Sequence, residues 1–355
     1  MRHEGESHMS MSAPKNFWYV AAFAADVGRD LLARTILGRQ LVIFRTEEGK
    51  VAILADRCPH RAVPLSLGTL IGDTIRCTYH GMQIAADGSC SRIPCQDLIP
   101  GKARADTFPA IERDKLIWVW MGDPALADPA AVPDFHWFDS PEWTACTGYH
   151  HIAANYQLLN DNLLDLSHES YVHEDTIGND AVAEAPVSAS VKDGKVYVSR
   201  EINNCEPPPF YVKTTGFKTN INRWHTTIFQ PPSFNVIENG SYPADGNRGQ
   251  ALERRILNMI TPETETSSHY FWGVARAFLH EDAALTAYIQ EQIYRTFDQD
   301  KVLLEAQQHN LGAETDAPFP VALRTDAGPI QARKLVRQIV EQEQQMEQME
   351  AAGVK

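Results

Sequence analysis

The sequence has few basic residues and no long apolar run. It carries 32 Lys and Arg against 46 Asp and Glu, and the formal net charge is −14 at pH 7. Nucleic acids and anionic membranes attract cationic surfaces, so neither is an expected partner. No stretch has the apolar length of a membrane span, and residues 1–11 lack the apolar segment of a secretory signal. We therefore expect a cytoplasmic protein with a disordered leader at residues 1–13.

Cysteine is also scarce, with six in 355 residues. Disulfides are not expected in a cytoplasmic chain, so the spacing of the cysteines carries more information than their number. A glycine-rich GxGxxG loop after an expected strand is missing too, and no internal NAD or flavin site is predicted. Apolar residues, in contrast, make up 43% of the chain, which is enough for one large or two modest domains.

The first third of the chain has the pattern of short strands between turns. Residues 39–45 and 51–54 flank Glu48-Gly49 and predict a hairpin, and the apolar run 116–120 predicts a closing strand. Residues 123–141 are rich in Pro, Ala and Asp, which is typical of a surface linker. We expect a β-rich domain at residues 14–125.

The remainder, residues 126–355, mixes helical and strand patterns. Leucines recur at helical spacing within residues 155–173, and residues 187–280 are strand-rich. Asp193-Gly194 and Asn239-Gly240 are candidate hairpin turns in that stretch. Long helices are expected at about 282–310 and 331–351. The predicted fold class is therefore α+β, with a β-rich first domain and a second domain of antiparallel sheet and helices.

Two short segments pair a cysteine with a histidine. Cys58-Pro59-His60 is followed by Cys77-Thr78-Tyr79-His80-Gly81. Two Cys and two His can bind zinc or hold a [2Fe–2S] cluster. Zinc sites favour CxxC and HxxxH pairs, whereas a cluster with differently ligated irons suits halves that each mix one Cys and one His. The spacing thus favours the cluster. Cys90 and Cys95 lack nearby histidines and are expected to be small buried residues.

A second candidate metal site follows the linker. His168 and His173 are five residues apart, about 140° around a regular helix, so both can face one metal only if the helix ends or bulges between them. Two histidines and one carboxylate with open positions are typical of non-haem Fe(II) oxygenases. Asp165, near His168, is expected to accept that ring's second N–H or to contact a cluster histidine.

The carboxylate ligand is expected from a later helix. Asp300 lies on the apolar stripe formed by Ile289, Ile293, Phe297 and Leu304, where a carboxylate is costly unless it is paired or bound to a metal. Asp298 lies off that stripe and is expected at the surface. Glu169 and Glu174 are alternative ligands.

These segments resemble the Rieske ring-hydroxylating oxygenases over nearly the whole chain. The motif Asn-x-x-Asp-x-x-His-x-x-x-x-His at residues 162–173 is similar, as are Pro14–Ala21, Cys58–Ser66, Ile260–Thr264 and Asp300–Glu305. The resemblance is greater to the single-subunit O-demethylases of the vanillate and dicamba type. It implies a Rieske domain and a helix-grip-like catalytic domain.

The resemblance also implies roles for individual residues. Cys58 and Cys77 would bind one iron of the cluster, and His60 and His80 the other. The catalytic Fe(II) would be held by His168, His173 and Asp300. Asn162 and Asp165 would be catalytic, with Asp165 bridging to a cluster histidine of a neighbouring subunit in a homotrimer. Electrons would come from NADH through a separate flavin and ferredoxin reductase.

The expected function is that of a terminal monooxygenase in the degradation of aromatic compounds. The reaction would be O₂-dependent O-demethylation of a methoxylated aromatic acid, with formaldehyde released. Alternatives are methyl or ring hydroxylation of another aromatic acid, as in toluenesulfonate-type monooxygenases, a non-catalytic Rieske electron carrier, and a zinc-binding structural protein. Asn258, Trp224 and His225 are candidate substrate contacts.

Overall fold

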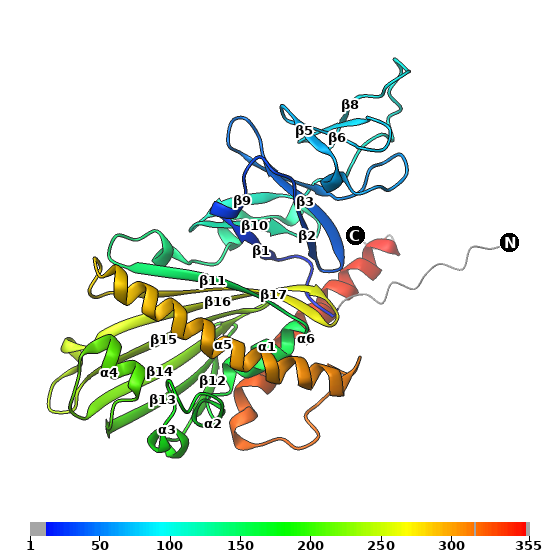
Figure 1. Ribbon diagram of the computed structural model, residues 1–355. Coiled ribbons are helices and arrows are strands. Elements are labelled where there is room, and N and C mark those ends of the chain that lie inside the picture. Colours follow the sequence, from blue (N-terminus) through cyan, green and yellow to red (C-terminus); the bar gives the residue numbers. More distant parts are fainter. Residues whose placement is uncertain (1–11, 316, 353–355) are drawn as a thin grey trace.

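The computed structural model describes residues 12–315 and 317–352 (Figure 1). The expected leader lies outside these residues except for Ser12 and Ala13, and for these two the expectation of disorder is wrong. Ala13 is buried in the main core, and the Tyr156 hydroxyl donates to the Ser12 carbonyl at 3.0 Å. No helix in the described part of the chain is long and apolar enough to cross a membrane.

Three small antiparallel sheets make up the N-terminal part, at the top of Figure 1. The first contains β1 (Trp18–Phe23), β10 (Leu116–Trp120) and β9 (Ala110–Arg113). The second contains β2 (Leu32–Ile36), β3 (Arg39–Arg45) and β4 (Val51–Ala55). The third contains β5 (Thr69–Ile71), β6 (Thr74–Arg76), β7 (Gln83–Ala85) and β8 (Cys90–Arg92). The expected hairpin at 39–54 and the strand at 116–120 are confirmed.

Short 3-10 helices fill the connections, and the linker contains three of them. They are η1 (Ala24–Asp26), η2 (Leu65–Leu67), η3 (Pro124–Leu126), η4 (Pro129–Ala131), η5 (His136–Phe138), η6 (Arg248–Gln250) and η7 (Arg324–Asp326). Asp123 and Asp128 cap η3 and η4, since each carboxylate accepts a backbone N–H of the first turn. Asp123-Pro124 and Asp128-Pro129 each begin a single 3-10 turn.

A seven-stranded antiparallel sheet forms the second part, in the order β11-β17-β16-β15-β14-β13-β12. Its strands are β11 (Thr144–Ile152), β12 (Ser188–Lys192), β13 (Lys195–Cys205), β14 (Ile221–Gln230), β15 (Phe234–Pro243), β16 (Leu252–Thr264) and β17 (Ser267–Arg276). The helices are α1 (Tyr156–Leu164), α2 (Glu169–Val172), α3 (Asp180–Glu184), α4 (Pro209–Thr215), α5 (Ala283–Leu311) and α6 (Ala327–Ala351). Both long helices were expected, and the α+β class is confirmed.

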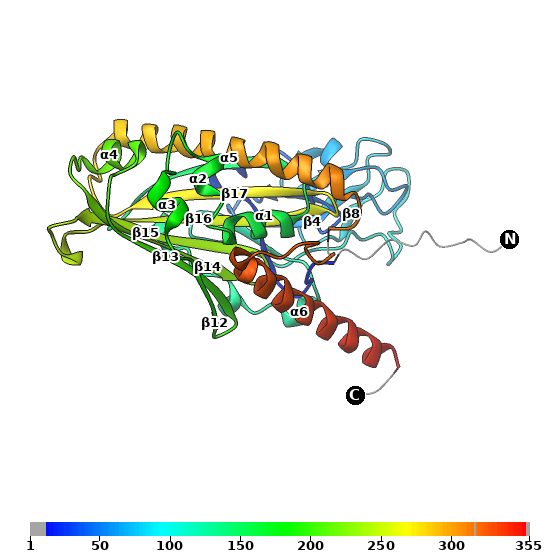
Figure 2. The same cartoon turned by 90° about the horizontal axis from the view of Figure 1, so that it is seen from below.

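The large sheet is the middle layer of the molecule. Because side chains alternate along a strand, β16 serves two cores at once. Ile256 and Ile260 pack into the core under the helices, whereas Leu257 and Met259 pack against the aromatic residues of β1 and β10. Figures 1 and 2 show α5 lying across one face of this sheet, with the N-terminal sheets on the other side. Buried side chains of the sheet and of α5 therefore share one core.

Of the two expected hairpin turns in this sheet, one is confirmed and one is wrong. Asp193 and Gly194 connect β12 to β13, both with positive φ. Asn239 and Gly240 instead lie inside β15, paired with β14 and β16. Glycine is present there because the Trp224 ring covers the backbone: a Cβ on Gly240 would lie 2.3 Å from Trp224 Cη2. Close approach, not turn geometry, explains this glycine.

We predict that Gly240→Ala destabilises the protein by about 1–3 kcal/mol, because the added methyl overpacks against Trp224. Urea unfolding followed by fluorescence measures the change in the free energy of unfolding. Gly28→Ala is the control, since a Cβ on Gly28 would meet no atom within 4 Å. Equal stability of the two variants would contradict this account of Gly240.

Candidate metal centres

The two Cys-His loops have the same backbone hydrogen bonds. The Cys58 N–H donates to the Val63 carbonyl at 2.9 Å, and the Cys77 N–H to the Met82 carbonyl at 2.8 Å. In each loop the fourth residue after the cysteine donates back to the cysteine carbonyl, from Ala62 at 2.9 Å and from Gly81 at 3.0 Å. Both of those residues have positive φ, 59° and 71°. The two loops therefore place cysteine and histidine on equivalent turns.

Burial divides the four side chains into two pairs. Cys58 and Cys77 are 3% and 2% exposed, whereas His60 and His80 are exposed and their ring centroids are 4.5 Å apart. This arrangement fits a cluster with one iron held inside by thiolates and the other at the surface on imidazoles. Desolvation, with the nearby His60 and Arg61 charges, lowers the pKa of His80, which favours the neutral ring that a metal requires.

Cys90 and Cys95 lie outside this set, as expected, but the prediction that they are buried is wrong. Cys90 on β8 is half-buried, and Cys95 is exposed in the following loop with a φ of 66°. Cys90 packs partly against the core that includes Ile75 and Ile84, whereas Cys95 lies in the loop after β8.

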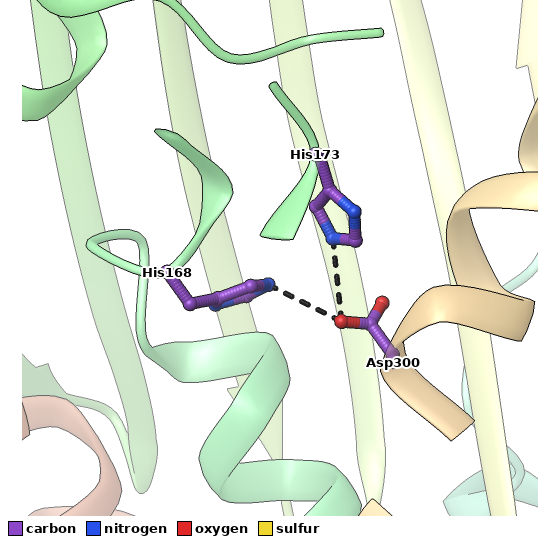
Figure 3. Close-up of side chains that lie close together, drawn as sticks. All are labelled: His168, His173 and Asp300. Carbon is purple, nitrogen blue, oxygen red and sulfur yellow. Dashed lines mark ion pairs between the residues drawn. The ribbon is translucent and has the colours of Figure 1, made fainter. Parts of the chain in front are cut away.

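The second centre lies where the helix after the linker is interrupted. Helix α1 ends at Leu164, His168 precedes the short helix α2, and His173 follows it. This break lets both imidazoles reach one point, as the sequence required. Figure 3 shows the two rings converging on Asp300 of α5, with His168 Nε2 at 3.5 Å and His173 Nε2 at 3.3 Å from Asp300 Oδ1. The three ligand atoms lie within 4.8 Å of one another.

Each histidine ring is oriented by a partner on its far nitrogen. His168 Nδ1 lies 2.5 Å from the Asp165 carbonyl oxygen, and His173 Nδ1 lies 2.9 Å from Gln299 Oε1. Both partners accept a hydrogen bond, which places the N–H on Nδ1 and leaves Nε2 with a lone pair toward Asp300. Burial lowers the pKa of His173, but Asp300 and Gln299 outweigh it and raise the value. The site thus fits a cation in the place of that proton.

The contact expected between the Asp165 carboxylate and His168 is absent, and this is a correction. The carboxylate instead accepts from Ser167, at 2.8 Å from the backbone N–H and 2.5 Å from the hydroxyl. The backbone carbonyl of the same residue takes the role predicted for the side chain. Sequence reasoning missed Gln299; its position next to Asp300 was the only signal.

Asp300 has a further partner on α1. It is 5% exposed on α5, and Asn162 Nδ2 donates to its Oδ1 at 3.1 Å. The alternative acids are excluded by their surroundings: Glu174 is exposed, and Glu169 is paired with Arg200 and His225. Asp298 lies at the surface, as expected. Asp300 is therefore the carboxylate that faces both histidines.

Glu169 joins this centre to the sheet. Its carboxylate lies 2.5 Å from Arg200 Nη2 and 3.1 Å from His225 Nδ1, and it is 3% exposed. Burial alone raises the pKa of a carboxyl, but His225, and then Arg200 and Arg223, hold the pKa of Glu169 far below its usual range. The ion pairs of Glu169 with Arg200 and His225 therefore hold the first residue of α2, directly after His168.

We predict that Glu169→Gln destabilises the fold by about 3–5 kcal/mol, because it leaves Arg200 buried without an anion. Glu174→Gln, at an exposed neighbour, is the control. A depressed folded-state pKa contributes stability above the unfolded-state pKa of about 4.3 and loses it as pH falls below that value. Wild-type stability should therefore fall more steeply than that of Glu169→Gln below about pH 4.3. Parallel curves from chemical unfolding across pH 3–7 would contradict this role.

A small cavity opens beside the second centre. Its walls include His168, His173 and Asp300, and most of the remaining wall is apolar, including Leu166, Phe210, Ile237, Ile256, Ile293 and Phe297. A mostly apolar cavity with a few convergent polar groups is the usual setting for binding a small organic molecule.

The expected substrate contacts are only partly placed at this cavity. His225 lines it, whereas Asn258 and Trp224 do not. The Asn258 amide donates to the Asn235 carbonyl at 3.0 Å and accepts from the Tyr270 hydroxyl at 2.7 Å, so its polar groups are used within the sheet. Trp224 packs over Gly240 and under Arg248. Asn258 and Trp224 therefore lie outside the cavity wall, and a substrate contact by either residue stays a prediction.

Comparisons with known proteins cover both parts of the chain. Residues 17–106 match the Rieske [2Fe-2S] domain, and residues 152–342 match the vanillate O-demethylase oxygenase C-terminal domain. The iron-sulfur subunit of the toluene-4-sulfonate monooxygenase system of Comamonas testosteroni is 37% identical, over 93% of this chain and 97% of that one. The vanillate O-demethylase oxygenase subunit of Pseudomonas sp. (strain HR199 / DSM 7063) is 38% identical, over 94% and 96%.

A solved structure has the same fold. The crystal structure of dicamba monooxygenase bound to 3,6-dichlorosalicylic acid matches with a TM-score of 0.87 and 33% identity, over 93% of this chain and 98% of that one. The matches span both the Cys-His loops and the His-His-Asp centre. The chain belongs to the Rieske non-haem iron oxygenases whose catalytic domain is of the vanillate O-demethylase type, and it is a monooxygenase component that uses a [2Fe–2S] cluster and a mononuclear iron.

Proposed function

We propose that the protein is the terminal oxygenase of a multicomponent system that O-demethylates a methoxylated aromatic acid. The observation that carries this proposal is the His-His-Asp centre in the wall of an apolar cavity. The similarity to vanillate and dicamba O-demethylase oxygenases supports the choice of reaction.

The proposal assigns the ligands as follows. Cys58, Cys77, His60 and His80 hold the [2Fe–2S] cluster, and His168, His173 and Asp300 hold Fe(II). When bound, the cluster supplies single electrons and the iron supplies O₂ activation. Asn162 keeps Asp300 in place, while Gln299 and the Asp165 carbonyl keep both rings in the tautomer that presents Nε2.

The cavity walls position the substrate and exclude water. Held with its methoxy group beside the His-His-Asp centre, the substrate exposes a methyl C–H to oxidation. Insertion of one oxygen atom gives a hemiacetal, which breaks its methyl C–O(aryl) bond to leave a phenol and formaldehyde. The second oxygen atom leaves as water after taking up two electrons and two protons, so the reaction balances with one NADH and one proton.

Electron delivery places Asp165 between two subunits in this proposal. His60 and His80 are exposed, and no hydrogen bond or ion pair between described residues joins either ring to Asp165 of the same chain. A neighbouring copy in a homotrimer would bring them together. A separate flavin and ferredoxin reductase would reduce the cluster, in the cytoplasm. We keep the division into a Rieske domain, residues 14–125, and a catalytic domain, residues 126–355.

A second candidate keeps both centres and changes the product. The 37% identity to a toluene-4-sulfonate monooxygenase subunit favours hydroxylation of a ring methyl on an aromatic sulfonate. The same cavity would present an aryl methyl instead of a methoxy group.

Formaldehyde release from methoxybenzoates tests the proposal. The assay combines protein with full iron content, NADH, a surrogate reductase and O₂, and it adds 4-toluenesulfonate as a separate arm. If the formaldehyde formed from a methoxybenzoate equals the NADH consumed, the result supports O-demethylation. A hydroxymethyl product from toluenesulfonate, without formaldehyde from any methoxybenzoate, would replace it with the second candidate.

A further inference from the structure

A buried arginine in the cavity wall has one edge without a partner. Arg254 on β16 is 1% exposed, and its Nη1 donates to Thr214 Oγ1 at 2.8 Å. Its Nε and Nη2 are buried and have no hydrogen-bond partner within the part of the chain that the structure describes. A buried cation with free donors is unfavourable unless something else pairs with it.

The free atoms form the edge of a guanidinium that binds two oxygens at once. Nε–H and Nη2–H point to the same side of the planar group, a fork that matches a carboxylate. Arg333 in this chain uses that edge: its Nε lies 3.0 Å from both carboxylate oxygens of Asp161, and its Nη2 lies 2.6 Å from one of them. Arg254 has the same edge without an acid, and its side chain is part of the cavity wall.

Aromatic rings hold Arg254 in place, while burial and the nearby Arg223 charge lower its pKa. The ring centroids of Phe210 and Tyr211 lie 5.0 and 4.8 Å from the guanidinium carbon of Arg254. Arg223 is also in the wall and is 4% exposed. Its guanidinium carbon lies 4.2 Å from the centroid of the Tyr211 ring. Apart from Asp300, the carboxylate in the wall is Glu169, which Arg200 and His225 already occupy. Positive charge is therefore in excess at this end of the cavity.

We propose that the Nε–Nη2 edge of Arg254 binds the anionic group of the substrate, a carboxylate or a sulfonate. This inference rests on the proposed function, because Arg254 lines the same cavity as the His-His-Asp centre. The anion held at Arg254 fixes one end of the aromatic ring, so the position of the methyl group relative to the acid decides whether it reaches the metal centre. Neutral analogues of the same shape lose this anchor.

Binding without turnover tests the anchor. Iron-loaded protein is titrated anaerobically with 4-methoxybenzoate, 4-methoxybenzenesulfonate and 4-methoxybenzamide in a calorimeter. Arg254→Met should weaken binding of the preferred anion about 100-fold, because two charge-assisted hydrogen bonds are lost, and leave the amide within about 3-fold. Comparing the two anions in the wild type identifies whether carboxylate or sulfonate is the natural group.

Arg276→Met is the matched control. Arg276 pairs with Arg254 across β16 and β17 and is also 1% exposed, but its donors are used by the carbonyls of Phe278, Leu279 and Asp282. That variant should lose stability and keep its preference for anions. Should Arg254→Met not fold, Arg254→Lys keeps the charge without the fork and should lose about 10-fold.

The outcomes separate the anchor from the reaction. If a folded Arg254 variant has the same ratio of anion affinity to amide affinity as the wild type, the anchor is overturned. The anchor is also overturned if the wild type binds the anions and the amide with equal affinity. Arg254-dependent binding of 4-methoxybenzoate without formaldehyde in the presence of O₂ supports the anchor and counts against O-demethylation.

Discussion

Asp300→Asn is expected to remove the mononuclear iron and with it nearly all product formation, while the Rieske cluster stays intact. The asparagine amide would place N–H donors or a neutral oxygen where both Nε2 atoms converge on Oδ1 at 3.5 and 3.3 Å. Loss of an outer partner of a metal ligand already costs about 10–100-fold, so loss of the ligand charge should exceed about 100-fold in turnover. Iron content and the visible spectrum of the cluster are measured on the same sample.

Asp298→Asn is the matched control, since this carboxylate is on the same helix but 67% exposed. It should retain iron, spectrum and turnover. If Asp300→Asn kept its mononuclear iron and full activity, Asp300 would not be an iron ligand. Another carboxylate of the cavity would then have to bind the iron.

Asp165→Asn is expected to slow turnover by about 10–100-fold, with both metals present. An asparagine oxygen can still accept from Ser167, as the carboxylate does at 2.8 and 2.5 Å. The backbone carbonyl that orients His168 is also kept. What disappears is the negative charge that, in the proposed trimer, faces a cluster histidine of the next subunit. The rate at which reduced cluster is reoxidised by O₂ in the presence of substrate reports this step.

Ser167→Ala provides the comparison for a purely structural role. It removes one hydrogen bond to the Asp165 carboxylate and keeps its charge, so reoxidation should change little. If Ser167→Ala slows reoxidation as much as Asp165→Asn does, Asp165 acts only by shaping the end of α1, and the proposed electron path is wrong.

The parts of the site that could be predicted are those fixed by spacing. Cys58, His60, Cys77 and His80 lie within two short loops, so the chain brings each pair together without help from the rest of the fold. His168 and His173 required a helix break, and the structure has one. Asp300 could be found because a carboxylate on an apolar stripe has few stable explanations.

The parts that could not be predicted depend on neighbours distant in sequence. Asn239-Gly240 has the composition of a turn, but Trp224 on the adjacent strand decides its place in β15. The sequence predicts a substrate contact for Asn258 but not the hydrogen bonds that its amide makes with Asn235 and Tyr270. Arg254 gave no signal at all, since an arginine within a strand is ordinary until its edge is found without an acid.

Formaldehyde from a single turnover tests the central claim most directly. Protein with both metals, reduced in advance and freed of reductant, holds the two electrons that one demethylation consumes. Mixing it with a methoxybenzoate and O₂ should give about one formaldehyde per mononuclear iron, without any reductase. Reoxidation of the cluster without formaldehyde, for every methoxybenzoate that binds, would contradict O-demethylation as the function of this oxygenase.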